Sequence, residues 1–197
     1  MIDLAFLKRA RIEPLDRTHD RAAFTCGDVQ LDNFIKNSAT KQQQEDIARV
    51  YVSCLDAEVI VIGYYALNSH SIDATTLPQK DRKKLPSYPT MPAIYLSKLG
   101  VHADFQGQGL GQLLMAHAFK RCVAAADIIG AHFLVLESLN EKSTKLYLKL
   151  GLVMLPGHEP RMIMKMALIR KAVALADAAA AAKAVADATA KTGGEAS

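Results

Sequence analysis

The chain has 197 residues, half of them hydrophobic, and a formal net charge of +4 at pH 7, which predicts one domain with a substantial core. Charged residues interrupt the first segment, and no apolar run reaches the roughly 20 residues that span a bilayer, so neither a signal peptide nor a membrane anchor is expected. The three cysteines have neither disulfide nor metal-ligand spacing, which predicts a cytoplasmic protein with reduced thiols and no metal site.

The first part of the chain predicts a strand, a helix and an antiparallel pair of strands. Asp28 is expected to cap the helix, and Leu31, Phe34 and Ile35 are expected to form its buried face. An acidic turn separates two segments rich in Val, Ile and Tyr, which is the pattern of a hairpin. The expected ranges are 11–15 for the first strand, 28–44 for the helix, and 49–55 and 59–68 for the strand pair.

The second part predicts alternating strands and helices. Residues 69–88 are rich in proline and charge, and we expect a long connection with one helical turn near 79–84. After residue 169 the composition turns to alanine, so we expect a domain over 1–169 and a helical or mobile tail over 170–197. The other expected ranges are 91–102, 132–138 and 162–168 for strands, and 110–126 and 140–150 for helices.

A glycine-rich turn lies between the strand expected at 91–102 and the helix expected at 110–126. Its alternate glycines can adopt backbone angles closed to other residues, and they leave N–H groups bare where a helix begins, an arrangement that binds phosphate. The turn lacks the Lys-Ser/Thr of a Walker loop and the Gly-x-Gly-x-x-Gly spacing of a dinucleotide fold. The pattern from Gln106 to Gly111, Gln-x-x-Gly-x-Gly, indicates a loop for the pyrophosphate of coenzyme A.

A second motif runs from Asn140 to Gly151, with the sequence NEKSTKLYLKLG. Helical spacing places Ser143 and Tyr147 on one face of the expected helix. By itself, such a tyrosine is more often an amphipathic core residue than a catalyst. Its place downstream of the glycine loop favours the catalytic interpretation.

With these motifs in this order, the sequence resembles the GCN5-related N-acetyltransferase (GNAT) superfamily from about residue 11 to residue 168. The resemblance implies an α/β fold, with a mixed, mostly antiparallel central sheet, a splayed strand pair and flanking helices. It also implies acetyl-coenzyme A as co-substrate, held by exposed strand backbone, by the N–H groups of the loop and by the asparagine of the second motif. The matching positions are Leu99, Gly100 and Val101 in the strand, Gln106, Gly107, Gln108, Gly109, Leu110 and Gly111 in the loop, and Asn140.

The N-terminal half is similar to the acetyltransferase toxins of type II toxin-antitoxin modules. The shared patterns are F-x-C-G-x3-L-D-x-F from residue 24, I-G-Y-Y-A-L from residue 62 and L-P-x-Y-P from residue 85. This resemblance implies acetylation of the alpha-amino group of aminoacyl-tRNA, a ribbon-helix-helix antitoxin as partner and a homodimer. Where family members often show GRLAVD, this chain has SKLGVH at 97–102, a difference that concerns substrate preference more than binding of the co-substrate.

Acetyl transfer to an amine needs a neutral nucleophile, stabilisation of the oxyanion and a proton for the leaving thiolate. We expect the Leu99 N–H to polarise the thioester carbonyl and the Tyr147 hydroxyl to protonate the thiolate. No convincing general base is evident, because Glu137 is at least as readily a solvated acid at a strand end. An alpha-amino group, with a pKa of about 7.7 to 8.0, is partly neutral without a base, unlike a lysine, which favours aminoacyl-tRNA as substrate.

Basic side chains are expected to contact tRNA phosphates with an affinity that falls with salt. Lys83 and Lys84 stand out because the corresponding connection in this superfamily lies near the acceptor side. Two other functions stay open: acetylation of a small amine or a protein N-terminus, and a non-catalytic acyl-coenzyme A binding domain, in which Tyr147 would point into the core. The candidate tRNA contacts are Lys36, Lys41, Arg49, Arg82, Lys83 and Lys84.

Overall fold

The computed structural model describes residues 3–83 and 85–192. Seven strands form one sheet in the order β1-β2-β3-β4-β5-β7-β6. Strands β4 and β5 run parallel, and the other neighbours in the described sheet are antiparallel, as the resemblance implies. The strands are β1 (Ala10–Pro14), β2 (Arg49–Leu55), β3 (Gly63–Asp73), β4 (Thr90–Val101), β5 (Phe133–Glu137), β6 (Val153–Met154) and β7 (Arg161–Lys165).

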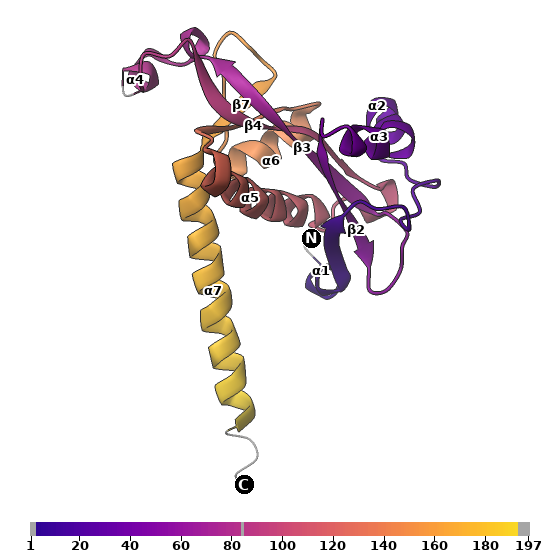
Figure 1. Cartoon of the computed structure of the whole chain (residues 1–197). Helices are drawn as coiled ribbons and strands as arrows, with labels where there is room; N and C mark the ends of the chain where they lie inside the picture. Colours follow the sequence, from indigo (N-terminus) through magenta and orange to yellow (C-terminus); the bar gives the residue numbers. More distant parts are fainter. Residues whose placement is uncertain (1–2, 84, 193–197) are drawn as a thin grey trace.

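Helices flank the sheet on both faces (Figure 1). The face that carries α5 and α7 holds the larger apolar cluster, which includes Leu114, Leu134 and Ile169. The α2–α3 segment packs on the opposite face, where a π-helical turn at Phe34–Ser38 joins the two helices. The helices are α1 (Leu4–Arg9), α2 (Val29–Asn33), α3 (Ala39–Gln44), α4 (Gln79–Arg82), α5 (Leu110–Ile129), α6 (Glu141–Lys149) and α7 (Met166–Thr192).

Local capping chemistry places the helices where the sequence predicts them. The Asp28 side chain accepts hydrogen bonds from the N–H groups of Gln30 and Leu31 and so caps α2. The expected face of Leu31, Phe34 and Ile35 is buried. Further along the chain, α6 begins after Asn140 and is followed by Gly151 in a left-handed conformation, with a φ of 92°.

Two expected strands have different bounds in the structure, and two short elements were not expected. Strand β3 runs to Asp73 and not to residue 68, because Asn68 to Asp73 pair with β4 although the segment is polar. Strand β7 ends at Lys165, and Met166 already begins α7. Helix α1 and the two-residue strand β6 had no signal in the periodicity, since both are too short to show one.

The parallel strands β4 and β5 separate at the place that positions the site. Strand β5 pairs with β4 from Ala93 to Leu96, whereas β4 continues to Val101 beside β3. A bulge marks the separation, since Leu96 pairs with Leu67 and Lys98 pairs with Ala66, leaving Ser97 as the extra residue. The described sheet therefore contains a splayed strand pair, and one edge of β4 is left without a strand partner beyond the bulge.

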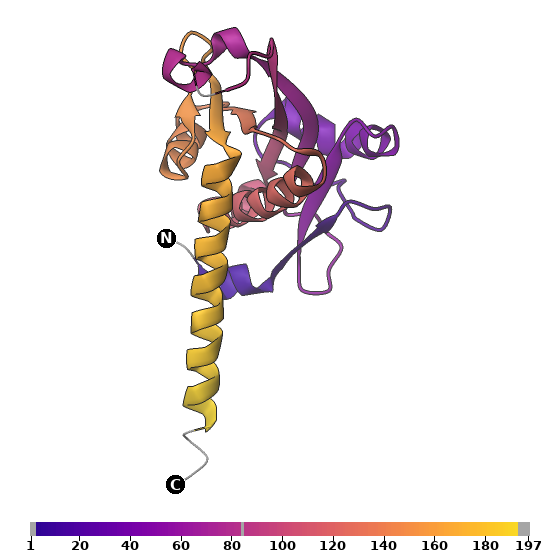
Figure 2. The same ribbon diagram turned by 60° about the vertical axis from the view of Figure 1, so that its left-hand side comes forward.

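Helix α7 has two parts. Its first turns pack on α5, with Met166 and Ile169 buried and Lys120 paired to Asp177 at 2.6 Å. The rest extends away from the sheet, as Figures 1 and 2 show from two sides. The tail expected over 170–197 is thus helical as far as Thr192, and residues 193–197 lie outside the described part of the chain. Neither α7 nor any other described helix is long and apolar enough to cross a membrane.

Candidate active site

A cavity of about 500 Å³ opens where β4 leaves β5. Its walls come from the end of β4, the glycine loop, the start of α5, the first turns of α6 and the segment that leads into α2. This volume falls in the range of small-molecule sites. The lining residues are Cys26, Gly27, Asp28, Leu31, Leu99, Gly100, Val101, Phe105, Gln106, Gly107, Gly109, Gly111, Gln112, Leu139, Asn140, Lys142, Ser143, Leu146 and Tyr147.

The end of β4 turns the backbone of Leu99 toward this cavity. The His102 N–H donates to the Ile62 carbonyl, on the β3 side. Because backbone groups of successive residues in an antiparallel pair point to opposite sides, Gly100 also faces β3, whereas Leu99 and Val101 face away from it. Beyond Leu96, no described strand pairs on that side. The Leu99 N–H and C=O are therefore free for a ligand.

The glycine loop presents unpaired donors at the start of α5. Gly107 and Gly109 have φ values of 80° and 98°, which other residues rarely adopt. In the described chain, the N–H groups from Gly107 to Gly111 donate no internal hydrogen bond. Gln106 differs, because its N–H donates to the Ala103 carbonyl at 3.3 Å. The bare amides at the N-terminus of a helix of 20 residues form a phosphate cradle.

Other members of the predicted loop have structural roles. The Gln106 side chain donates to the carbonyls of Cys26 and Val101, at 2.9 and 3.0 Å, and so ties the segment before α2 to β4. The Leu110 side chain is buried in the core beneath α5. Gln108 is not among the lining residues, and its side chain donates to the Asp104 carbonyl.

Tyr147 lies in the cavity wall with its ring in the core. The residue is 5% exposed, and burial raises its pKa to about 12. Its hydroxyl forms no hydrogen bond with the described residues. The oxygen is not fully enclosed, and the residue lines the cavity. The ring therefore has a structural role, while the oxygen reaches the cavity as a protonated, unpaired donor.

Asn140 lines the cavity but also caps α6. Its side-chain oxygen accepts from the Ser143 N–H at 2.9 Å, and its N–H donates to the Ser143 hydroxyl at 3.1 Å. This reciprocal pair is a capping box. The amide nitrogen of the Asn140 side chain makes no hydrogen bond within the described chain, so it remains available to a ligand.

Two groups of lining residues had no clear signal in the sequence. The segment Cys26 to Asp28 reaches the cavity because α2 packs against the end of β4, a tertiary contact that periodicity does not encode. Burial raises the pKa of the Cys26 thiol to about 11, so the thiol is neutral and unreactive. Lys142 lies at the cavity wall with its ammonium 3.5 Å from the Gln106 side-chain oxygen, and it adds a cation beside the glycine loop.

The predicted tRNA contacts lie outside this cavity. Arg49 is paired to Asp46 at 2.8 Å and Lys41 approaches Glu45 at 3.9 Å, both at exposed positions. Lys36 lies on the π-helical turn between α2 and α3. Arg49 begins β2 and lies beside the end of α3 through its pair with Asp46, so these three residues belong to the part of the molecule that carries α2 and α3, seen in Figure 1.

Arg82 and Lys83 lie at the opposite end of the β3–β4 hairpin. They line a second cavity of about 580 Å³ together with Tyr88, which is 64% exposed. The connection begins after Asp73, which pairs with Thr90 at the start of β4, whereas the first cavity lies at the end of β4. The described part of this connection therefore lies at the other end of the hairpin from the first cavity, and its contact with tRNA stays a prediction. Lys84 lies outside the described residues.

Glu137, the carboxylate considered as a possible base, is held by an arginine. Its side chain accepts two hydrogen bonds from Arg161, the shorter of them 2.8 Å. The pairing of the two residues across β5 and β7 explains the contact. Glu137 is not among the residues that line the cavity, so the arrangement favours the interpretation of this residue as an acid at a strand end with no part in the reaction.

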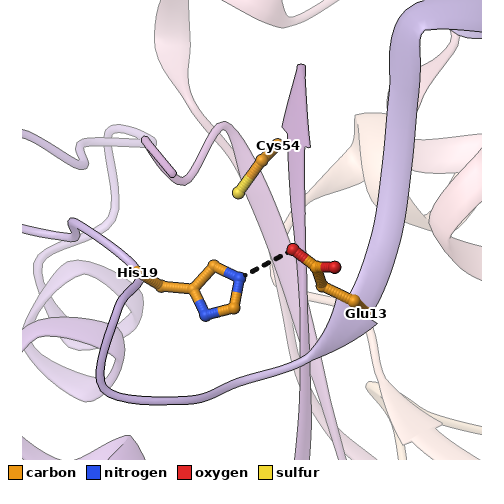
Figure 3. Close-up of side chains that lie close together, drawn as sticks. All are labelled: Glu13, His19 and Cys54. Carbon is orange, nitrogen blue, oxygen red and sulfur yellow. Dashed lines mark hydrogen bonds and ion pairs between the residues drawn. The ribbon is translucent and has the colours of Figure 1, made fainter. Parts of the chain in front are cut away.

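One cluster outside the cavity has the residue types of a metal site. Glu13, His19 and Cys54 have ligand atoms within 4.8 Å of one another (Figure 3). Both ring nitrogens of His19 are already engaged, Nε2 by Glu13 and Nδ1 by Asp16, each at 2.9 Å. Burial raises the pKa of the Cys54 thiol to about 11, which disfavours the thiolate that metals require. The cluster is explained as hydrogen bonding that fastens a loop to β1.

Comparison with known proteins finds acetyltransferases. The model of the acetyltransferase (GNAT) family matches residues 61–152. A probable toxin TacT of Sinorhizobium fredii is 40% identical over 167 residues, which cover 81% of this chain and 92% of the relative. A tRNA-acetylating toxin of Mycobacterium tuberculosis is 34% identical over 128 residues, which cover 65% of this chain and 75% of the relative.

Solved structures share the fold. AtaT complexed with acetyl-methionyl-tRNAfMet has a TM-score of 0.76 at 33% identity, with 82% of this chain and 97% of that chain covered. A single-residue variant of the AtaT toxin, bound to the C-terminus of the antitoxin AtaR and acetyl-CoA, has a TM-score of 0.69 at 28% identity, with 82% and 96% covered. The chain therefore belongs to the acetyltransferase (GNAT) family, together with relatives that include tRNA-acetylating toxins.

Proposed function

We propose that this protein transfers the acetyl group of acetyl-coenzyme A to the alpha-amino group of aminoacyl-tRNA, and that it acts as the translation-blocking toxin of a type II toxin-antitoxin module. The observation that carries the proposal is the meeting of the bare amides from Gly107 to Gly111, the free N–H of Leu99 and the hydroxyl of Tyr147 in one cavity. Relatives described as tRNA-acetylating toxins support the choice of acceptor.

The residues that line the cavity suit acetyl-coenzyme A in their chemistry. The amides at the start of α5 provide donors for the pyrophosphate, and Lys142 adds a positive charge at the same wall. The outward-facing backbone of Leu99 and Val101 supplies a donor and acceptors for the amide groups of the pantetheine arm, although Val101 already accepts from Gln106. Apolar side chains, including Leu31 and Leu146, line the remaining wall.

The co-substrate supplies the acetyl thioester, and residues of this chain supply the polar contacts for the reaction. The Leu99 N–H donates to the carbonyl oxygen, on which negative charge develops as the amine attacks. The Tyr147 hydroxyl donates its proton to the sulfur that leaves, while the amine nitrogen gives up one proton to water and water reprotonates the tyrosine oxygen. Because burial raises the pKa of Tyr147 to about 12, this hydroxyl remains protonated at neutral pH.

The acceptor amine must be neutral without the help of a base in the site. Within the described cavity wall, the one carboxylate is that of Asp28, which already caps α2. An alpha-amino group of pKa about 7.7 to 8.0 is partly neutral without a base, whereas a lysine side chain of pKa about 10.4 is not. The absence of a base among the lining residues therefore favours an aminoacyl ester over a lysine.

The partners follow from the same proposal. A toxin of this kind acts in the cytoplasm, and we propose that a ribbon-helix-helix antitoxin restrains it and that the protein forms a homodimer. The antitoxin-bound structure of an AtaT variant supports the existence of such a partner. An antitoxin with an acidic segment would complement the net positive charge of the chain.

The experiment that tests this function compares acceptors. The purified protein is incubated with labelled acetyl-coenzyme A and, separately, with total charged tRNA, deacylated tRNA and a lysine-containing peptide. The proposal expects label in the charged tRNA alone. Label in the peptide with none in the tRNA would support the alternative of a protein acetyltransferase, and no transfer to any acceptor would support a non-catalytic binding domain.

A further inference from the structure

Four polar side chains lie on neighbouring strands, on the sheet face that also carries α2 and α3. We call His70 on β3, Tyr95 on β4, Glu137 on β5 and Arg161 on β7 the polar strip, and none of them is buried. Residues two apart in a strand lie on the same face of the sheet. Each member of the strip is two residues from a buried apolar residue, and these four apolar residues belong to one cluster. These apolar residues are Ile72, Ala93, Val135 and Ile163.

The members of the strip form two contacting pairs. The rings of His70 and Tyr95 lie with centroids 5.3 Å apart at an angle of 34°. Arg161 donates two hydrogen bonds to Glu137, which fix the plane of the guanidinium. A guanidinium has five N–H donors, so this contact does not use all of them. Burial, with a smaller effect of the Arg161 charge, lowers the pKa of His70, so its ring is neutral at pH 7 and lies tilted against that of Tyr95.

The strip leads away from the proposed reaction centre. Tyr95 precedes Leu99 by four residues, roughly 13 Å along the strand, and His70 pairs with Ala93, roughly 20 Å from Leu99. Glu137 and Arg161 pair with each other one position beyond Leu136, the partner of Leu96, so they lie level with Ser97, between Tyr95 and Leu99. Further along the same hairpin lies the connection with Arg82, Lys83 and Tyr88.

Aromatic faces next to a guanidinium are the features by which proteins bind single-stranded nucleic acid. Bases stack on aromatic rings, and arginine binds the phosphate between them. An acidic peptide would use Arg161 but would have no use for the neutral ring pair. The combination of rings and cation therefore favours a nucleotide as the occupant of the strip.

We propose that His70 and Tyr95 form a stacking platform for a nucleotide of the single-stranded 3′ end of tRNA, with Arg161 on the adjoining phosphate. This inference rests on the proposed function and adds the path of the acceptor. With the terminal nucleotide held on the strip, the aminoacyl group extends past Ser97 to Leu99. The body of the tRNA then lies toward Arg82 and Lys83, which accounts for basic residues so far from the cavity.

The test measures tRNA affinity at one salt concentration for intact tRNA and for tRNA trimmed of its 3′ single strand. Replacing Tyr95 with leucine removes the aromatic face and keeps an apolar side chain, whereas Tyr95→Phe keeps the ring and serves as the matched control. We expect Tyr95→Leu to weaken binding of intact tRNA about tenfold, the effect of losing one stacked base. Trimmed tRNA should bind the two variants and the original protein equally.

A second variant and a second acceptor separate this inference from the proposed function. His70→Ala should weaken binding of intact tRNA in the same way, and both Tyr95→Leu and His70→Ala should keep the original affinity for acetyl-coenzyme A, which checks folding. An equal loss for intact and trimmed tRNA, or no loss for either variant, would overturn the platform. If the original protein acetylates no aminoacyl-tRNA, the proposed function fails, independently of the affinities measured here.

Discussion

Tyr147 combines a buried ring with an oxygen that reaches the cavity, and this division explains how one residue serves both packing and chemistry. The ring belongs to the core beneath α5, and the hydroxyl lacks a partner within the described chain. Two other buried tyrosines differ in this respect. Tyr64 donates to the Leu31 carbonyl at 2.8 Å, and the Tyr65 oxygen lies 2.7 Å from Nδ1 of His117.

This contrast yields a matched pair of substitutions. Tyr147→Phe should lower kcat by about 100-fold or more, the usual effect of losing a general acid, without changing the affinity for acetyl-coenzyme A. Tyr65→Phe should leave kcat unchanged and lower the free energy of unfolding by about 1 kcal/mol, because it removes one hydrogen bond. Steady-state kinetics and thermal unfolding measure both; equal kcat values for the two variants would contradict the assignment.

At the scale of residues, much of the site could be predicted from the sequence, because these features depend on local chemistry. Positive φ values at Gly107 and Gly109 and the cap at Asn140 follow from residue type and neighbours. The ion pair of Glu137 with Arg161 could not be predicted, because these residues are brought together only by the β5–β7 register. The same holds for Cys26, which enters the cavity wall through packing of α2.

At the scale of elements, β4 and α5 each contribute a glycine for a different reason. A Cβ on Gly100 would lie 2.8 Å from the ring of Tyr64, which is fixed by its hydrogen bond to Leu31. A Cβ on Gly111 would find its nearest neighbours at 3.8 and 3.9 Å, an ordinary contact. Gly100 is therefore needed for packing between the strands, and Gly111 for an open cavity wall.

The two glycines provide a second paired prediction. Gly100→Ala should lower the free energy of unfolding by about 1–3 kcal/mol, as overpacking does. Gly111→Ala should leave it unchanged or raise it by up to about 1 kcal/mol, since alanine favours the helix. Of the two variants, Gly111→Ala alone should weaken the binding of acetyl-coenzyme A while the protein stays folded, because its methyl group covers the amides of the loop. Calorimetry measures both quantities, and undiminished binding by Gly111→Ala would argue against this location of the pyrophosphate.

Helix α7 bears on where the domain ends. The composition suggests a boundary at 169, yet Val173 packs against the main core and Asp177 pairs with Lys120. We propose that the domain includes the first three turns of α7. Ending the chain after residue 180 should leave the melting temperature and activity unchanged, since positions 178–182 are exposed. Ending it after residue 168 should cost at least about 2 kcal/mol, because fully buried Ile169 is lost. Thermal unfolding of the two truncations distinguishes the boundaries.

At the scale of the whole molecule, the predicted tRNA contacts in the described chain form two groups. Arg82 and Lys83 lie at the turn of the β3–β4 hairpin, and the others lie around α3 and the start of β2. This distribution suits a ligand much larger than coenzyme A. The class of fold, the order of the longer elements and the splayed pair were predicted, because the family pattern covers them. The position of the cavity relative to Arg82 and Lys83 could not be predicted, because the bulge at Ser97 and the length of β3 are set by strand pairing.

Reversing charge far from the cavity tests this distribution. Arg82→Glu with Lys83→Glu should raise KM for aminoacyl-tRNA and leave KM for acetyl-coenzyme A unchanged. If both side chains contact phosphate, the slope of log affinity against log salt should fall by about 2. Lys171→Glu with Lys183→Glu on α7 makes the same change in net charge and should have a much smaller effect. Similar effects of the two double variants would indicate net charge and not a local contact.

The most direct test of the central claim is to identify the bond that the enzyme makes. Charged tRNA is incubated with the protein and acetyl-coenzyme A and digested with nuclease, and the released aminoacyl-adenosine is analysed by mass spectrometry. The account predicts one added acetyl group on the alpha-amino nitrogen, formed by the original protein and lost or strongly reduced with Tyr147→Phe. Aminoacyl-adenosine without added mass, or acetylation at equal rate by Tyr147→Phe, would contradict it.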